Sequence, residues 1–424
     1  MQPSPPCPLW SPSRRRWLGA AGAAWLLSAC GGGGGGDGGG GNLEPIATSL
    51  DTLTPENQAA TFRHIDRLYA TRRFARGSTV RALPAHPVSL DGLRFAAAAG
   101  STSIDEHMAR HRSSGLLVLK DGRIALERYA MGNTASSLWT SFSVAKSLTS
   151  TLIGLALQDG RIGSLDDAVD AFVPALRGSA YEGCSIRSLL RMTSGVAWNE
   201  DYTSASSDIA RLRAVFTSGQ PGAMLELMRT RPRAAPVGSV WNYSTGETYV
   251  LGAVLAAATG GTLADALSRG IWGPAGMEAD GYWLLDAPGG LEMGGSNFSA
   301  TLRDHGRLGL FVLEGGTAGS PLPAGWSALA GRPDSAVTGY GQLVPGGGYP
   351  LGYGYQWWSF PSGGTFAPHA GAFVAQGIFG QFLYVNPAQR VVAVVWSAWP
   401  DVWTNTGEFD TYALLGAAVT ALAS

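Results

Sequence analysis

The chain has 424 residues, of which 45% are hydrophobic and 14% are charged, and its formal net charge at pH 7 is −1. A chain of this length can bury a large core, either as one domain or as two closely joined domains. Because neither sign of charge is in excess, we expect no nucleic-acid partner and no strongly charged protein partner.

The first 30 residues predict a secretory signal peptide. Arg14, Arg15 and Arg16 precede an apolar stretch at 17–27, which is too short for a bilayer core that requires about 20 residues. The stretch ends in Leu-Ser-Ala-Cys30, which resembles a bacterial lipobox, whose cysteine is acylated and becomes the mature N-terminus. The arginines resemble a twin-arginine export signal, and an ordinary Sec signal is the alternative.

A glycine-rich run at 31–41 follows and predicts a flexible tether, since glycine has no side chain to bury. Acylation of Cys30 would anchor the protein to a membrane. Gly31 stands where an inner-membrane retention signal would resemble an aspartate. We therefore expect a lipid-anchored protein of the Gram-negative cell envelope, on the outer membrane and facing the periplasm.

The next predicted elements belong to an N-terminal extension and the start of a sheet. The extension spans 42–87 and includes one predicted helix at about 55–71. Two strands at 116–120 and 124–129 are expected to form a hairpin. A helix is predicted from about 143 to 158, because leucine and isoleucine recur on one helical face.

The second half of the chain predicts helices first and strands later. Helical periodicity marks 246–260 and 263–272. Apolar runs at 373–385 and 390–399 predict a strand hairpin, and 411–423 predicts a closing helix.

Early strands, a helical middle and late strands predict an α/β fold in which one sheet is completed across an insertion. We expect residues 88–163 and 291–424 to form the α/β domain and residues 164–290 to form an inserted, mostly helical domain. A cleft between the two would be the natural place for a site.

A serine and a lysine on the helix predicted at 143–158 suggest nucleophilic catalysis. Only two of the 30 basic residues are lysines, Lys120 and Lys146, and Lys146 follows Ser143 by nearly one helical turn. A desolvated lysine amine can lose its proton near neutral pH, whereas arginine cannot. Genomic arginine bias also explains the scarcity of lysine. Since no Gly-x-Ser-x-Gly elbow occurs, a Ser-His-Asp hydrolase is not expected.

Three motifs in order, Ser143-x-x-Lys146, Tyr243-Ser-Thr245 and His369-Ala-Gly371, resemble those of the serine β-lactamase and penicillin-binding-protein superfamily. The resemblance runs from about residue 114 to the C-terminus. It is closest to the class C-related branch that contains 6-aminohexanoate-dimer hydrolase and family VIII-type esterases, and it implies a β-lactamase-like fold, with an antiparallel sheet from N- and C-terminal strands flanked by helices. Four more stretches support it: 189–195, 243–248, 299–304 and 352–358.

The resemblance implies catalytic roles for three side chains. Ser143 would be the nucleophile, Lys146 the base that activates it, and Tyr243 a second acid/base whose pKa a neighbouring ammonium would lower. The backbone N–H groups of Ser143 and Ala372 would hold the oxyanion.

Other positions are candidates for substrate binding. His369 and Gly371 are expected on a strand edge that lines the cleft. Thr245 stands where β-lactamases commonly have asparagine, and His369 where many members have lysine, so efficient β-lactam hydrolysis is not expected. Tyr202 resembles a second cleft tyrosine of the 6-aminohexanoate-dimer hydrolase branch, and an exposed loop aromatic is the alternative.

The sequence therefore predicts a serine hydrolase that cleaves a small-molecule ester or amide, or a peptide, through an acyl-enzyme on Ser143. One alternative is a D-Ala-D-Ala carboxypeptidase or weak β-lactamase, and another is a non-catalytic envelope lipoprotein that binds peptide or peptidoglycan. We expect no cofactor and no metal, because His107 and His111 share a helical face but lack a third ligand.

Overall fold

The computed structural model describes residues 44–333 and 351–423. The predicted signal peptide, the lipidation site at Cys30 and the tether at 31–41 lie outside the described residues. Among the residues that are described, no single helix is both long and apolar enough to cross a membrane; the pair Thr245–Thr259 and Leu263–Trp272 has the length and composition only when taken together, and it is bent by 73°.

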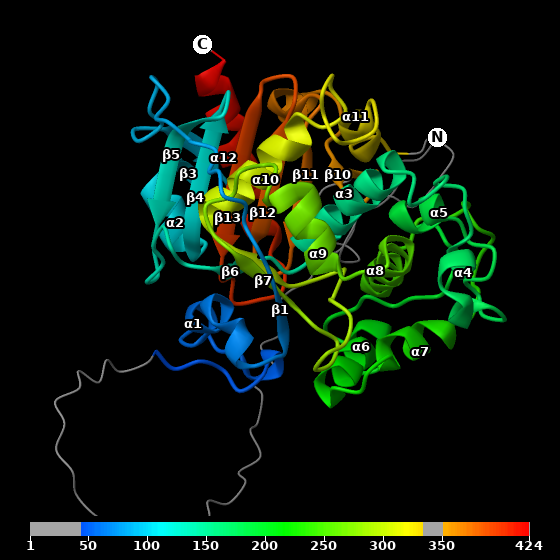
Figure 1. Ribbon diagram of the computed structural model, residues 1–424. Helices are drawn as coiled ribbons and strands as arrows, with labels where there is room; N and C mark the ends of the chain where they lie inside the picture. Colours follow the sequence, from blue (N-terminus) through cyan, green and yellow to red (C-terminus); the bar gives the residue numbers. More distant parts are fainter. Residues whose placement is uncertain (1–43, 334–350, 424) are drawn as a thin grey trace, which may run out of the picture. The chain divides into compact units, whose positions relative to one another are not determined.

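A seven-stranded antiparallel sheet forms the centre of the fold, in the order β5-β4-β13-β12-β11-β10-β9 (Figure 1). Strands from the two ends of the chain meet where β4 pairs with β13, with Leu117 opposite Val394. This confirms the predicted sheet of N- and C-terminal strands. The bounds are Ser113–Lys120 (β4), Arg123–Tyr129 (β5), Gly352–Tyr353 (β9), Trp358–Ser359 (β10), Phe373–Gly377 (β11), Gln381–Asn386 (β12) and Val391–Ser397 (β13).

Both faces of this sheet are covered, so its central strands are apolar on both sides. Leu117 and Leu119 belong to the core that includes α10, whereas Leu116 and Val118 belong to the core that includes α12. Successive side chains of a strand point to opposite faces, which explains the alternation. The helices that cover the sheet are α2 (Ile104–Arg110), α3 (Val144–Gln158), α10 (Leu302–Leu313) and α12 (Asn405–Leu422), and a short helix α11 spans Trp326–Ala330.

The elements in the middle of the chain are helices from Val169 to Trp272, while its division as an inserted domain stays a prediction. Its longest helix, α8, packs against α3, the helix that follows Ser143. The predicted limit at 290 is not where the strands return, since β7 begins at Gly281. The helices are Val169–Phe172 (α4), Ile186–Leu190 (α5), Asp208–Ser218 (α6), Ala223–Arg229 (α7), Thr245–Thr259 (α8) and Leu263–Leu267 (α9), the last continued by one π-helical turn to Trp272.

A second sheet, in the order β1-β7-β8-β6, ties the N-terminal extension to the strand that precedes Ser143. Gly281 on β7 admits the Phe74 ring so closely that a Cβ atom there would lie 2.3 Å from it. The predicted helix at 55–71 is therefore too long, because the chain must already be extended to pair with β7. The bounds are Gln58–Arg63 (α1), Thr71–Phe74 (β1), Trp139–Thr140 (β6), Gly281–Leu284 (β7) and Phe298–Ala300 (β8); Arg94–Ala97 (β2) and Gly100–Ser103 (β3) form a separate hairpin.

The predicted strand at 373–385 is two strands, β11 and β12, separated by a tight turn at 378–380. Phe379 has a φ of +62° and Gly380 a φ of +84°, both in the left-handed region. A Cβ atom on Gly380 would lie 2.4 Å from the Trp399 ring, so the turn requires glycine there. This correction matters for the site, because the turn lies beside Ser143.

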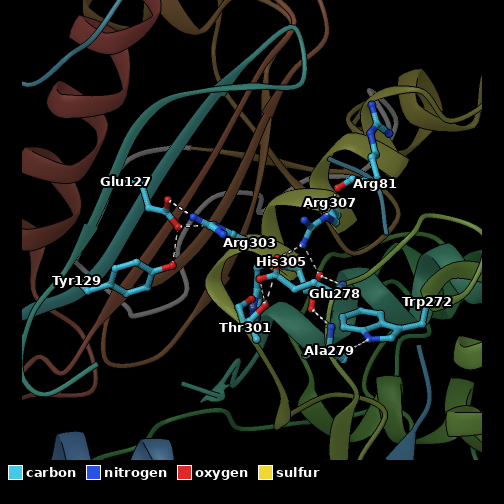
Figure 2. Close-up of polar contacts among 11 residues, drawn as sticks. Arg81, Glu127, Tyr129, Trp272, Glu278, Ala279, Thr301, Arg303, His305 and Arg307 are labelled. Carbon is cyan, nitrogen blue, oxygen red and sulfur yellow. Dashed lines mark hydrogen bonds and ion pairs between the residues drawn. The ribbon is translucent and has the colours of Figure 1, made fainter. Parts of the chain in front are cut away.

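Residues 299–304, one of the stretches that resemble the superfamily, hold helix α10 in place (Figure 2). Asp304 accepts hydrogen bonds from the backbone N–H groups of Glu278 and Ala279, at 2.8 and 3.0 Å. Arg303 makes a bidentate ion pair with Glu127 on β5, with bonds of 2.7 and 2.8 Å. Charge-assisted bonds of this kind fix geometry, so the stretch joins α10 to the main sheet and to the loop before β7.

Candidate active site

Ser143 lies at the N-terminus of α3, where it is the N-cap residue. The preceding residue, Phe142, has a φ of +44°, a conformation that costs about 1–3 kcal/mol for a residue with a Cβ atom. Its ring is held by Phe62 of the extension, at 4.8 Å between ring centres, and by Phe379, at 5.3 Å. Packing therefore maintains a strained turn that presents Ser143 at the positive end of a helix dipole.

Lys146 contacts Ser143 from one turn further along α3. Its ammonium donates hydrogen bonds to Ser143 Oγ at 3.0 Å and to the backbone oxygen of Gly295 at 2.8 Å. The lysine side chain is 1% exposed. Burial lowers the pKa of Lys146 to about 8, although the negative charge of Glu200 opposes the shift. The neutral amine, which can accept a proton, is thus accessible near neutral pH.

Tyr243 completes a cluster with these two residues. Lys146 Nζ lies 5.0 Å from the centre of the Tyr243 ring, and the nearby Ser143 side chain partly opposes a rise of the Tyr243 pKa. Burial, reinforced by the charge of Glu200, holds the pKa of Tyr243 above its usual range. The expected lowering of this pKa is therefore wrong, because loss of hydration outweighs the nearby ammonium. Tyr243 is built to keep its proton until a stronger base takes it.

Glu200 is the functional candidate that sequence reasoning missed. Its carboxylate accepts hydrogen bonds from the Tyr202 hydroxyl at 2.8 Å, from the backbone N–H of Thr245 at 3.0 Å, and from the side chains of Thr245 and Trp198. A carboxylate is stabilised at the N-terminus of a helix, here α8. In the sequence, the one feature that pointed to Glu200 was its position two residues before Tyr202.

A cavity of about 80 Å³ opens beside Ser143 and brings two predicted substrate contacts to it. Tyr202, which is half-buried, and Thr245, which is buried, both line the cavity. The other lining residues are Leu50, Phe142, Ile209, Leu212, Arg213, Phe216, Met293, Ser296, Asn297, Ile378, Phe379 and Val402.

His369 and Gly371 do not line this cavity, and their expected place on a strand edge is wrong. His369 ends a 3-10 helix, Gly364–His369, and β11 begins only at Phe373. The His369 ring stacks on Phe360 at 4.5 Å between ring centres, and its Nδ1 lies 3.1 Å from the Tyr384 hydroxyl. Burial lowers the pKa of His369 to about 4, so it is neutral at physiological pH.

The expected oxyanion donor Ala372 is also corrected. Its backbone N–H already donates to the backbone oxygen of His369, at 2.9 Å. Ile378, in the turn after β11, lines the same cavity as Ser143. Within residues 44–333 and 351–423, neither the Ser143 N–H nor the Ile378 N–H has a hydrogen-bond acceptor. Both groups are free backbone donors beside the nucleophile, and both residues line the cavity.

Metal-ligand chemistry has no comparable arrangement in the described part of the chain. No group of three His, Cys, Asp or Glu side chains there is placed to hold a metal ion. His107 is fully buried, and His111 Nε2 lies 2.7 Å from a carboxylate oxygen of Asp410 on α12. The two histidines thus belong to the packing of α2 against its neighbours.

Comparisons with known proteins agree with this fold. The family model described as beta-lactamase matches residues 101–415. The 6-aminohexanoate-dimer hydrolase of Paenarthrobacter ureafaciens is 30% identical over 363 residues, which cover 82% of this chain and 86% of that protein.

Solved structures show the same architecture. A putative 6-aminohexanoate-dimer hydrolase from Bacillus anthracis has a TM-score of 0.75 at 21% identity, with 89% of this chain and 96% of that chain covered. A family VIII carboxylesterase has a TM-score of 0.57 at 15% identity, with 75% and 96% covered. From the family match and the relative, we conclude that this chain belongs to the beta-lactamase family and is a serine hydrolase.

Proposed function

We propose that the protein hydrolyses an ester or amide through an acyl-enzyme on Ser143. The observation that carries this proposal is the 3.0 Å contact between a fully buried lysine amine and the Ser143 hydroxyl at a helix N-terminus. The substrate class is that of a carboxylesterase or of an enzyme that cleaves a linear amide such as the 6-aminohexanoate dimer.

The chemistry begins when neutral Lys146 takes the proton of Ser143 Oγ, which attacks the carbonyl carbon. The backbone N–H groups of Ser143 and Ile378 stabilise the oxyanion. Tyr243 donates its proton to the departing alcohol or amine, and the Lys146 ammonium returns a proton to the phenolate. Water then attacks the acyl-enzyme, and the same groups act in reverse to release the acid.

Two alternatives are less well supported. A β-lactamase or D-Ala-D-Ala peptidase would gain from a cation at His369, but that ring is neutral, buried and directed toward Phe360 and Tyr384. A non-catalytic binding protein would have no need of a buried amine in contact with a serine hydroxyl, an arrangement that costs stability.

Labelling by a fluorophosphonate probe tests the nucleophile. Wild-type protein should be labelled, and Ser143→Ala and Lys146→Ala should not. The control is Ser136→Ala, an exposed serine that precedes β6, which should be labelled like wild type. Turnover is then compared on p-nitrophenyl esters, linear amide oligomers, nitrocefin and D-Ala-D-Ala peptides. Labelling that survives Ser143→Ala would sink the proposal, and turnover of nitrocefin alone would favour the β-lactamase.

The cellular location is a separate proposal that rests on the N-terminal sequence. We propose that Cys30 is acylated and that the protein is anchored to the outer membrane, facing the periplasm. In fractionated Gram-negative cells, Cys30→Ser should move the protein out of the membrane fraction, whereas Cys7→Ser should not. A wild-type protein that is fully soluble in the periplasm would contradict the anchor.

A further inference from the structure

One charged side chain interrupts the apolar wall of the cavity beside Ser143. On α6, the residues Ile209, Leu212, Arg213 and Phe216 all line the cavity. They lie on one face of the helix, three or four residues apart. A face of this kind is expected to be apolar throughout. Among the described residues that line the cavity, Arg213 alone carries a charge.

The guanidinium of Arg213 has unused capacity to donate hydrogen bonds. Its Nη1 forms an ion pair with Asp51 at 3.4 Å, but no side-chain hydrogen bond of Arg213 is made within residues 44–333 and 351–423. Its Nε is buried and has no partner there. The Arg213 side chain is 38% exposed, so water can reach its outer nitrogens, and the buried Nε is the donor that gains from an acceptor the protein itself does not supply.

The N-terminal extension provides the opposite side of this site. A short 3-10 helix, Leu50–Thr52, places Leu50 in the cavity wall, and the Leu50 N–H donates to the Tyr69 hydroxyl at 2.9 Å. Asp51 follows with a side chain that is 59% exposed. An exposed ion pair contributes little to stability. A second carboxylate can therefore replace Asp51 at Arg213 at little cost.

The cavity is positioned to hold the acyl part of a substrate. Ser143 and Ile378, whose N–H groups would bind the oxyanion, both line it, whereas Tyr243, the proposed proton donor to the leaving group, does not. Two other charged groups lie near the serine, and both already have partners: Lys146 donates to Ser143 and Gly295, and Glu200 accepts from Trp198, Tyr202 and Thr245. The acyl chain thus meets an apolar cavity in which Arg213 is the one charged residue among the described lining residues.

We propose that the preferred substrate has a linear apolar acyl chain that ends in a carboxylate, and that this carboxylate binds Arg213 in place of Asp51. This assignment rests on the proposed acyl-enzyme function. It makes Arg213 a specificity-determining residue and gives the N-terminal extension a role in substrate selection. An acyl chain that ends in an ammonium group, such as the acyl half of the 6-aminohexanoate dimer, would be repelled from the same position, so within the proposed class of linear amides that dimer is not the preferred substrate of this protein.

Matched ester substrates test the assignment. A series of p-nitrophenyl esters of increasing chain length is prepared with a terminal carboxylate, and each has a partner of equal length with a terminal carboxamide. At the best chain length, kcat/KM for the carboxylate should exceed that for the carboxamide roughly 3- to 10-fold, because the new bond replaces the weaker contact with Asp51 at a partly exposed guanidinium. Arg213→Gln should abolish this preference, and Asp51→Asn should increase it.

Arg211→Gln is the matched control, because Arg211 lies on the same helix and pairs with Asp208, outside the cavity. It should retain the preference of the wild type. Equal turnover of the two esters by wild type, or a preference that survives Arg213→Gln, would overturn the assignment while leaving the hydrolase intact. Failure to turn over either ester, together with no labelling of Ser143, would instead overturn the proposed function.

Discussion

The buried amine of Lys146 predicts a specific dependence of acylation on pH. With a pKa of about 8, about one tenth of the lysine is neutral at pH 7 and about half at pH 8. The acylation rate should therefore rise nearly tenfold from pH 6 to pH 7, reach half of its maximum near pH 8 and level off above pH 9. Glu200→Gln removes a charge that raises this pKa, so the midpoint should move to lower pH.

The same shift has a thermodynamic consequence for folding. The unfolded chain keeps the Lys146 proton up to about pH 10.5, whereas the folded protein releases it near pH 8. Between these values the unfolded state binds more protons, so the free energy of unfolding should increase with pH. Relative to Lys146→Met, wild type should gain up to about 3 kcal/mol across this window, as measured by urea denaturation.

Stopped-flow measurement of the p-nitrophenol burst gives the acylation rate directly, without interference from deacylation. Lys146→Arg is the matched variant, because it keeps a positive charge but supplies no neutral base near pH 8. It should fold and show no burst at any pH up to 10. A burst whose midpoint lies below pH 7 in wild type, or one that persists in Lys146→Arg, would refute the assignment of Lys146 as the base.

Two other predictions concern packing and a second buried acid. Gly281→Ala forces a Cβ atom into the Phe74 ring and should lower the free energy of unfolding by about 1–3 kcal/mol. The control is Gly92→Ala, which has nothing within 4 Å of the added Cβ atom and should leave the free energy of unfolding unchanged. Equal thermal midpoints of the two variants would contradict the packing argument. Glu247 has a pKa raised to about 8 by burial. The protonated Glu247 side chain stabilises the fold below about pH 4.5, and this stabilisation is lost as pH rises through about 8. Glu247→Gln should therefore be more stable than wild type at pH 9. In thermal denaturation it should also lose less stability than wild type between pH 5 and pH 9. A wild-type curve parallel to that of the variant would exclude a raised pKa.

The sequence predicted those parts of the site that depend on local patterns. The spacing of Ser143 and Lys146 on one helix, and the helix itself, follow from periodicity that is visible in a short window. The turn at 378–380 does not, because its hydrogen bonds are made with residues about 20 positions further along the chain: the Phe379 N–H donates to the Val402 oxygen at 2.9 Å, and the Trp399 N–H donates to the Phe379 oxygen at 3.2 Å. The resemblance of His369-Ala-Gly371 to the third family motif led to Ala372 as oxyanion donor, and Ile378 was overlooked.

Glu200 and Tyr243 show a second limit, which is electrostatic. Glu200 acts through contacts with Thr245, 45 residues away, and no spacing rule predicts that pair. The pKa of Tyr243 depends on how completely the ring is buried, and Trp358, which stacks on it at 5.6 Å between ring centres, comes from a distant strand. Local sequence patterns identified the residue types and the order of the motifs, but they could not show that lost hydration raises the pKa of Tyr243 more than a nearby positive charge lowers it.

The position of β13 in the main sheet determines when the sheet can fold during synthesis and how far the chain can be truncated. The strand lies between β4 and β12, so residues 391–397 join the first strands of the sheet to the last. Until this segment is available, β4 has an unpaired edge along its whole apolar length. A chain that ends before residue 391 would therefore lack an internal strand of the sheet, not an edge strand. The sheet can form completely only after the C-terminal part of the chain has been synthesised.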